Sequence, residues 1–67
     1  MQPFSAEDRA MLAELVPKAQ RLSRISRTTY QIWIEQLSTH QRGLLVRWIA
    51  IYGERWNVAT LADLEQA

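Results

Sequence analysis

The chain has 67 residues, so it forms one domain at most, and its 48% hydrophobic and 22% charged residues are typical of a folded chain. It contains no cysteine, which excludes a disulfide scaffold, a thiolate zinc site and a cysteine nucleophile. The longest apolar run, residues 48–52, is too short to cross a bilayer, and the first residues lack the pattern of a signal peptide. We therefore predict a single helical domain over residues 1–67, located in the cytoplasm and without a membrane partner.

The small size of the chain has a consequence for its stability. Chains this short usually need disulfides, a metal ion or another subunit to complete a stable core. Disulfides are excluded, and the chain has one histidine and no cysteine to form a metal-binding cluster. We therefore expect a homo-oligomer, a dimer or larger, or a tight complex with another protein.

Charge is distributed unevenly, although the formal net charge is only +1. Residues 20–47 carry five arginines against the single acid Glu35, whereas the segments before and after them are each slightly acidic. Arginine favours bidentate contacts with carboxylates or phosphates. The simplest interpretation is that these charges form solvated helix faces.

The first predicted helix begins after Ser5, a good N-cap residue that is followed by two acids in the first turn. The apolar residues that follow cover an arc of about 140° at helical spacing. They are Met11, Leu12, Leu15, Ala19, Leu22 and Ile25. Gln20 lies opposite this arc, on the polar side. The pattern predicts a helix over residues 6–25.

Pro17 interrupts the predicted first helix, because it lacks a backbone donor and its ring clashes with the carbonyl group of Ala13. The apolar arc nevertheless keeps its phase across the proline. We therefore expect one helix that is kinked at Pro17. The alternative is two short helices, the second capped by Val16, but valine is a poor cap.

The segment over residues 29–37 fits two patterns. Tyr30, Ile32 and Ile34 alternate with other residues as in a half-buried strand, whereas Tyr30, Trp33, Ile34 and Leu37 follow helical spacing. We predict a helix, preceded by a break and a new cap within residues 26–29, because Leu37 extends the helical fit.

The third predicted helix covers residues 39–52. Ser38 and Gln41 have the spacing of a capping box, and Gly53 is suited to end the helix in a left-handed conformation. Apolar residues cover about 220° of its circumference, more than a one-sided surface helix needs. They are Leu44, Leu45, Val46, Trp48, Ile49, Ile51 and Tyr52, and His40, Gly43, Arg47 and Ala50 form the remaining strip. This helix is therefore either the centre of the fold or part of an interface.

The C-terminal segment combines two signals. Residues 56–60 alternate as in a short strand, and Thr60 precedes a second helix start with Leu61 and Leu64 on one side. The sequence thus predicts an all-α bundle of three main helices with a short C-terminal element that is helical or extended.

No residues form a catalytic, cofactor-binding or metal-binding pattern, so we predict that the protein is not an enzyme. His40 has the features of an ordinary exposed histidine, and the paired acids Glu7 with Asp8 and Asp63 with Glu65 stand where helix starts favour acids. The two glycines are too few for a phosphate-binding loop.

Two groups of side chains are candidates for binding. Arg21, Arg24 and Arg27 recur every three residues and, with Lys18, could hold phosphates. A helix-turn-helix around Ser38 is disfavoured, because its second helix would present core-like residues to the bases. The large aromatic residues are common both in interfaces and in cores. The interaction candidates are Arg21, Arg24, Arg27, Trp33, Arg47, Trp48, Tyr52 and Trp56.

The sequence therefore favours a small protein that acts by binding another protein or itself. A regulator, an inhibitor, an adaptor and an assembly factor are all compatible with it. The alternative is a small nucleic-acid-binding regulator that uses the arginine flank.

Overall fold

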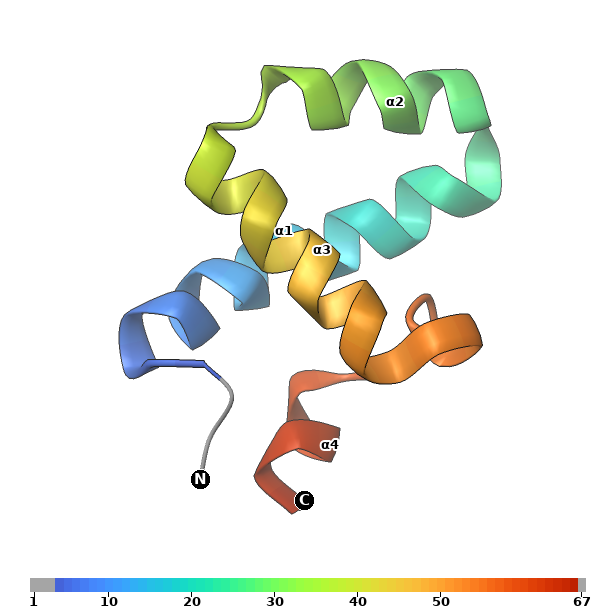
Figure 1. The fold of residues 1–67 in the computed structure, drawn as a ribbon. Helices are drawn as coiled ribbons and strands as arrows, with labels where there is room; N and C mark the ends of the chain where they lie inside the picture. The colour runs from blue at the N-terminus through green and yellow to red at the C-terminus, as the bar shows by residue number, and fades with distance from the viewer. Residues whose placement is uncertain (1–3, 67) are drawn as a thin grey trace.

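The computed structural model describes residues 4–66, and within this range the chain forms helices and turns but no strand. Helix α1 spans Ala6–Ile25, α2 spans Arg27–Gln36 and α3 spans Thr39–Tyr52 (Figure 1). A 3-10 turn, η1, follows at Gly53–Arg55, and α4 spans Leu61–Gln66. The prediction of three main helices and a short C-terminal element is confirmed. The strand-like alternations at residues 30–35 and 56–60 do not form strands.

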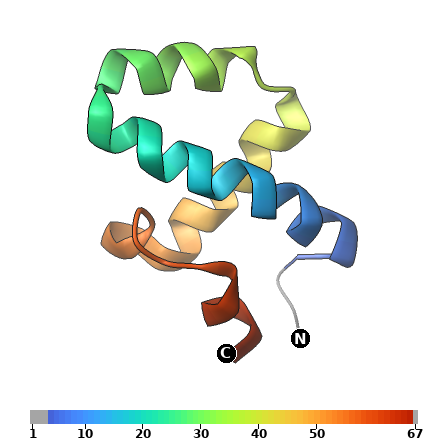
Figure 2. The same cartoon turned by 180° about the vertical axis from the view of Figure 1, so that it is seen from behind.

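Helix α1 is the element on which the others pack. It contacts α2, α3 and α4, whereas α2 and α3 make few contacts with each other. Helix α2 runs back along α1, and α3 crosses α1 on one side (Figures 1 and 2). The shortest extent, 17 Å, leaves room for two layers of helices, since packed helix axes lie about 8–10 Å apart. Each main helix therefore keeps a face that no other helix covers.

Helix α1 is continuous through Pro17, so the prediction of one helix rather than two is confirmed. Its start has the predicted cap, in which the Ser5 hydroxyl accepts a hydrogen bond from the Asp8 N–H at 3.1 Å. Pro17 and Ala13 are both exposed, so water can satisfy the Ala13 carbonyl group that the proline leaves without its helical partner.

Helix α2 begins two residues earlier than predicted, at Arg27 rather than residue 29. The reason is that Ser26 serves both neighbouring helices. Its extended backbone ends α1 while its N–H donates to the Leu22 carbonyl group, and its hydroxyl accepts from the Thr29 N–H at 3.3 Å. The predicted cap further along the Ser-Arg-Thr-Thr segment is therefore not used.

Helix α3 begins and ends at the predicted residues, although Gly53 has a positive φ without the ψ of a left-handed helical residue. Ser38 and Gln41 form the capping box, each side chain bonding the backbone of the other residue, with N···O distances of 3.1 and 3.0 Å. Gly53 ends the helix with φ 58° and ψ −130°. This positive φ explains why a glycine stands there, because a Cβ would be strained.

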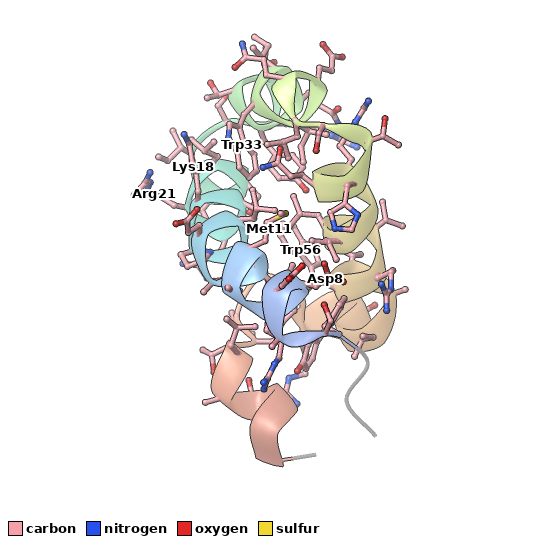
Figure 3. All side chains as sticks on the ribbon, turned by 90° about the vertical axis from the view of Figure 1, so that its left-hand side faces the viewer. Asp8, Met11, Lys18, Arg21, Trp33 and Trp56 are labelled. Atoms are coloured by element: carbon pink, nitrogen blue, oxygen red, sulfur yellow. The ribbon has the colours of Figure 1, made fainter. Side chains whose placement is uncertain are left out.

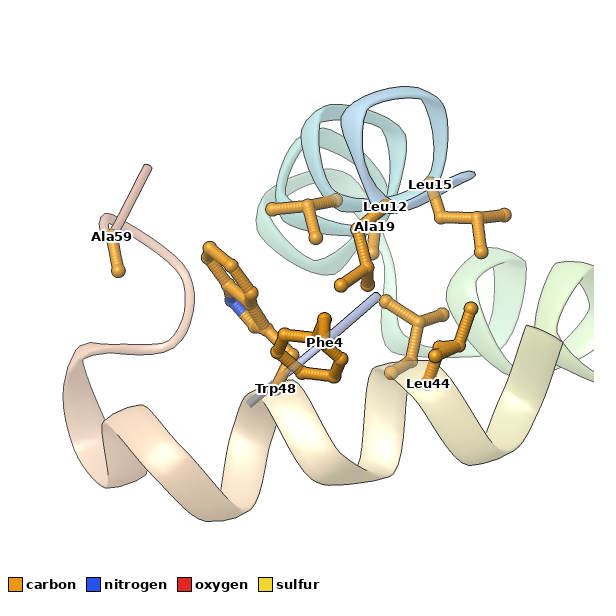
Figure 4. Close-up of a cluster of buried hydrophobic side chains, with 9 residues drawn as sticks. Phe4, Leu12, Leu15, Ala19, Leu44, Trp48 and Ala59 are labelled. Atoms are coloured by element: carbon orange, nitrogen blue, oxygen red, sulfur yellow. The ribbon is translucent and has the colours of Figure 1, made fainter. Parts of the chain in front are cut away.

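The core lies between α1 and α3, with Phe4 drawn beside Trp48 and Ala59 at one edge of the cluster (Figure 4). The buried hydrophobic residues are Phe4, Leu12, Leu15, Val16, Ala19, Leu44, Leu45, Trp48 and Ala59. The predicted apolar arc of α1 is wrong at one end, because Ile25 is 69% exposed. Val16 is buried instead, which shifts the buried face of α1 towards Gln20.

Gln20 accordingly does not lie opposite the core, as the sequence suggested. It is half-buried, and its Nε2 donates to the carbonyl groups of Trp56 and Ala59 at 3.0 and 2.7 Å. The Trp48 Nε1 donates to the same Trp56 carbonyl group at 3.1 Å. Two side chains from different helices therefore hold the segment that follows η1 against the core.

Helix α4 begins after Thr60, as predicted. The Asp63 carboxylate accepts from the Thr60 N–H at 2.8 Å and thereby satisfies a backbone donor at the helix start. This hydrogen bond gives Asp63 a structural role at the start of α4. The partners in two predicted pairs, Leu64 beside Leu61 and Glu65 beside Asp63, have side chains that the structure does not describe.

Candidate interaction surface

The predicted arginine flank is divided among three environments. Arg21 is exposed on α1, and Arg24 donates a hydrogen bond to the Asn57 carbonyl group, which attaches it to the C-terminal segment. Arg27 lies beyond the break at Ser26, in the first turn of α2. The three arginines are therefore not a single row of free guanidinium groups.

The outward face of α1 carries charges of both signs. Lys18 and Arg21 project from α1 on the side away from α3 (Figure 3). Glu7 and Glu14 are also exposed, and their spacings of eleven and four residues to Lys18 place them on the same side of the helix. Two acids thus offset two bases on this face, which weakens its attraction for a polyanion.

The aromatic candidates hold the helices together. Trp48 is fully buried, and its ring centroid lies 4.6 Å from that of Tyr52. Trp56 and Trp33 are half-buried and lie 5.9 and 6.4 Å from the ring of Tyr30 on α2. Lys18 places its Nζ 5.6 Å from the Trp33 ring, a cation–π contact between α1 and α2. Trp48 is accordingly a core residue in the free protein.

Both tyrosines of this aromatic network are affected by their surroundings. Burial raises the pKa of the Tyr30 hydroxyl. Burial also raises the pKa of Tyr52, the Asp63 carboxylate raises it further, and Arg55 opposes the shift. The folded protein therefore favours the neutral form of both hydroxyl groups.

The outer face of α3 was not singled out as a whole from the sequence, although Arg47 on it was an interaction candidate. We define the outer α3 face as the exposed residues opposite the buried Leu44, Leu45 and Trp48. Its members are Thr39, Arg42, Gly43, Val46, Arg47 and Ala50. Val46 is 65% exposed, and a Cβ added at Gly43 would meet no atom within 4 Å. In Figure 1 no other element is drawn in front of α3.

A finer interpretation of the sequence would have found this surface. The wide apolar arc of the third predicted helix included Val46 and Ile51, which are 65% and 46% exposed. Leu44, Leu45 and Trp48 lie within about 100° of one another around the helix, and Val46 lies on the far side from them together with Thr39 and Ala50. The arc therefore contains part of the core and part of the molecular surface.

The outer α3 face carries positive charge and no negative charge. The sequence has no Asp or Glu between Glu35 and Glu54. Arg47 lies with its Cζ 4.7 Å from the Phe4 ring centroid, and Arg42 is exposed with no described side chain paired to it. His40, at the edge of this face, contacts the Asp8 carboxylate at 3.0 Å.

The described part of the chain carries no pocket, metal cluster or membrane-spanning helix. No pocket opens on its surface, and no group of three or more His, Cys, Asp or Glu residues is arranged to hold a metal ion. None of its helices combines the length and the apolar character needed to span a bilayer. No protein-family model, curated protein or solved structure matches the chain.

Proposed function

We propose that this protein acts without catalysis, by binding another protein through an exposed helix surface. The observation that carries the proposal is the outer α3 face. It combines an apolar centre at Val46 with arginines beside it, and arginine and apolar residues are common in protein interfaces. The roles compatible with this activity are those of a regulator, an inhibitor, an adaptor or an assembly factor in the cytoplasm.

The packing of the chain supports a need for a partner. Helix α3 leaves two of its large apolar residues in water, since Val46 is 65% and Ile51 is 46% exposed. The chain has only 67 residues and no disulfides. It therefore gains stability when a partner covers this exposed apolar surface. The partner is another protein or a second copy of the chain.

The second candidate function is nucleic-acid binding. The single sign of charge on α3 favours it, since phosphates attract Arg42 and Arg47 as carboxylates do. The net charge of +1 and the mixed charges on α1 weigh against it, because binding to a polyanion increases with the number of cations that face it.

Purification of the tagged protein from its native host, with and without nuclease, separates the two candidates. We expect a protein that co-purifies in fixed stoichiometry and survives nuclease treatment. Recovery of nucleic acid alone, with every protein lost after nuclease, would promote the second candidate. Recovery of no protein, no nucleic acid and no self-associated form would contradict both.

A further inference from the structure

The C-terminal strap, which we define as residues 56–66, is fastened to the rest of the chain through its own backbone. Three of its carbonyl groups accept hydrogen bonds from side chains of α1 and α3. The donors are Gln20, Arg24 and Trp48, and the acceptors are the carbonyl groups of Trp56, Asn57 and Ala59. The strap leaves α3 through η1 and turns back to α1 (Figures 1 and 2). The body of the chain, residues 4–52, therefore presents a docking site that the strap occupies.

One residue sets the direction in which the strap leaves α3. Tyr52 and Trp56, on either side of η1, both have right-handed helical backbone angles. Within residues 39–56 only Gly53 has a positive φ, with φ 58° and ψ −130°. Glycine moves between positive and negative φ at little steric cost. Rotation of Gly53 alone to helical angles would join α3 and η1 into one helix and carry the strap away from its own body.

We propose that the strap is exchanged between two copies of the chain, so that the partner at its docking site is a second copy. In the paired form each Gly53 is helical, and each strap makes on the other body the hydrogen bonds that it makes on its own. Because each copy gives and receives the same segment, the exchange closes a two-fold dimer. This exchange does not involve the outer α3 face and so goes beyond the proposed function.

The contacts of the strap favour a second copy over a segment of another protein. Ala59 is 1% exposed, so a longer side chain at this point would have to displace core residues. The ring of Trp56 lies 5.9 Å from the ring of Tyr30 on α2. A second copy supplies all of these contacts at once. A foreign segment would have to reproduce them in competition with a strap that is tethered beside its site.

The balance between the closed and exchanged forms depends on the tether and on Gly53, because the strap contacts are the same in both. A short tether holds its segment at a millimolar local concentration, so half of the wild-type chains should pair at about 1 mM. An alanine at position 53 should favour the helical hinge over the positive φ by about tenfold per chain. Two chains pair, so the midpoint should fall about a hundredfold, to about 10 µM. Below that concentration the substitution only destabilises the closed form.

Sedimentation equilibrium of the full-length chain tests the hinge. The samples are wild type, Gly53→Ala and Gly43→Ala, and the last places the same substitution within α3, where a Cβ meets no atom within 4 Å. At about 50 µM, between the two expected midpoints, Gly53→Ala should be mostly dimeric and the other two samples monomeric. Circular dichroism checks that each variant is folded.

Nuclear magnetic resonance on mixed wild-type chains identifies the exchanged contact without any substitution. Equal parts of a nitrogen-labelled and a carbon-labelled chain are unfolded in urea and refolded together at millimolar concentration. We expect a nuclear Overhauser effect between the Gln20 side-chain amide of one chain and the protons of Ala59 of the other, because these groups are hydrogen-bonded neighbours. A dimer formed through any other surface would not give this signal.

Three outcomes would overturn the exchange. They are a folded Gly53→Ala variant that stays monomeric at millimolar concentration, equal pairing of Gly43→Ala, and a mixed sample without the contact between Gln20 and Ala59 of different chains. If Gly53→Ala does not fold, the mixed wild-type sample decides alone. A different protein that co-purifies from the host supports the proposed function under any of these outcomes.

Discussion

The carbonyl group of Trp56 provides a sharp test of how the C-terminal segment is held. It accepts hydrogen bonds from the Gln20 Nε2 and the Trp48 Nε1, at 3.0 and 3.1 Å. Gln20→Met keeps the length of the side chain but removes its amide group, which donates to the Ala59 carbonyl group as well as to that of Trp56. Trp48→Phe keeps an aromatic ring in the core and removes the second donor to Trp56.

The expected magnitudes follow from the number of bonds lost. Gln20→Met loses two neutral hydrogen bonds and should cost about 1–3 kcal/mol, because one such bond contributes roughly 0.5–1.5 kcal/mol. Trp48→Phe loses one bond and part of a fully buried side chain. In each single variant the Trp56 carbonyl group keeps one donor, whereas the double variant leaves it with neither.

The two substitutions should therefore not be additive. The double variant should lose about 1 kcal/mol more than the sum of the single variants, since an unpaired, partly buried carbonyl group pays a desolvation penalty. The assay is urea unfolding followed by circular dichroism for wild type, both single variants and the double variant. Additive losses, or a Gln20→Met variant as stable as wild type, would refute the shared-acceptor interpretation.

Three further predictions concern the backbone and pH. Pro17→Ala should raise the free energy of unfolding by about 1–3 kcal/mol, because Pro17 is exposed within a continuous helix, and a lower melting temperature would contradict this. Gly43→Ala should raise the free energy of unfolding by about 0.5–1 kcal/mol, because a Cβ at this helical position meets no other atom. Gly53→Ala should lower it by about 1–2 kcal/mol because of the positive φ of Gly53. Melting temperatures that change in the same direction for both variants would contradict this. Burial raises the pKa of Tyr30 and Tyr52, so stability is complete below the unfolded pKa of 10.0 and falls as the pH rises through the raised values. Urea midpoints between about pH 9 and pH 11 should show this fall, and Tyr30→Phe should reduce it; a midpoint that stays constant would count against the burial.

The local signals in this sequence predicted helices well. The caps at Ser5 and Ser38 are formed by side chains that bond backbone groups three residues away, and Gly53 is required by its own φ angle. Such features depend on a few neighbouring residues, so they can be interpreted without knowledge of the tertiary structure. The continuity of α1 through Pro17 followed from the phase of its apolar residues.

Features that depend on contacts between distant segments were not predicted. Gln20 is polar, and its role arises only because the chain returns after 36 residues to place the Trp56 carbonyl group beside it. Ile25 has the spacing of a core residue, but it is the last residue of α1 and its side chain is exposed. The outer α3 face was hidden for a similar reason, since Val46 resembles a core residue until the two-layer arrangement leaves it in water.

The central claim is that the outer α3 face contacts another protein, and site-specific photo-cross-linking in the native host tests it most directly. A benzophenone side chain at position 46 should give a protein adduct of defined mass, and the adduct should diminish when Arg42→Glu is added. The same group at position 32, an exposed site on α2, should give no such adduct. Adducts from position 32 without any from position 46, or adducts from position 46 that contain only nucleic acid, would contradict the claim.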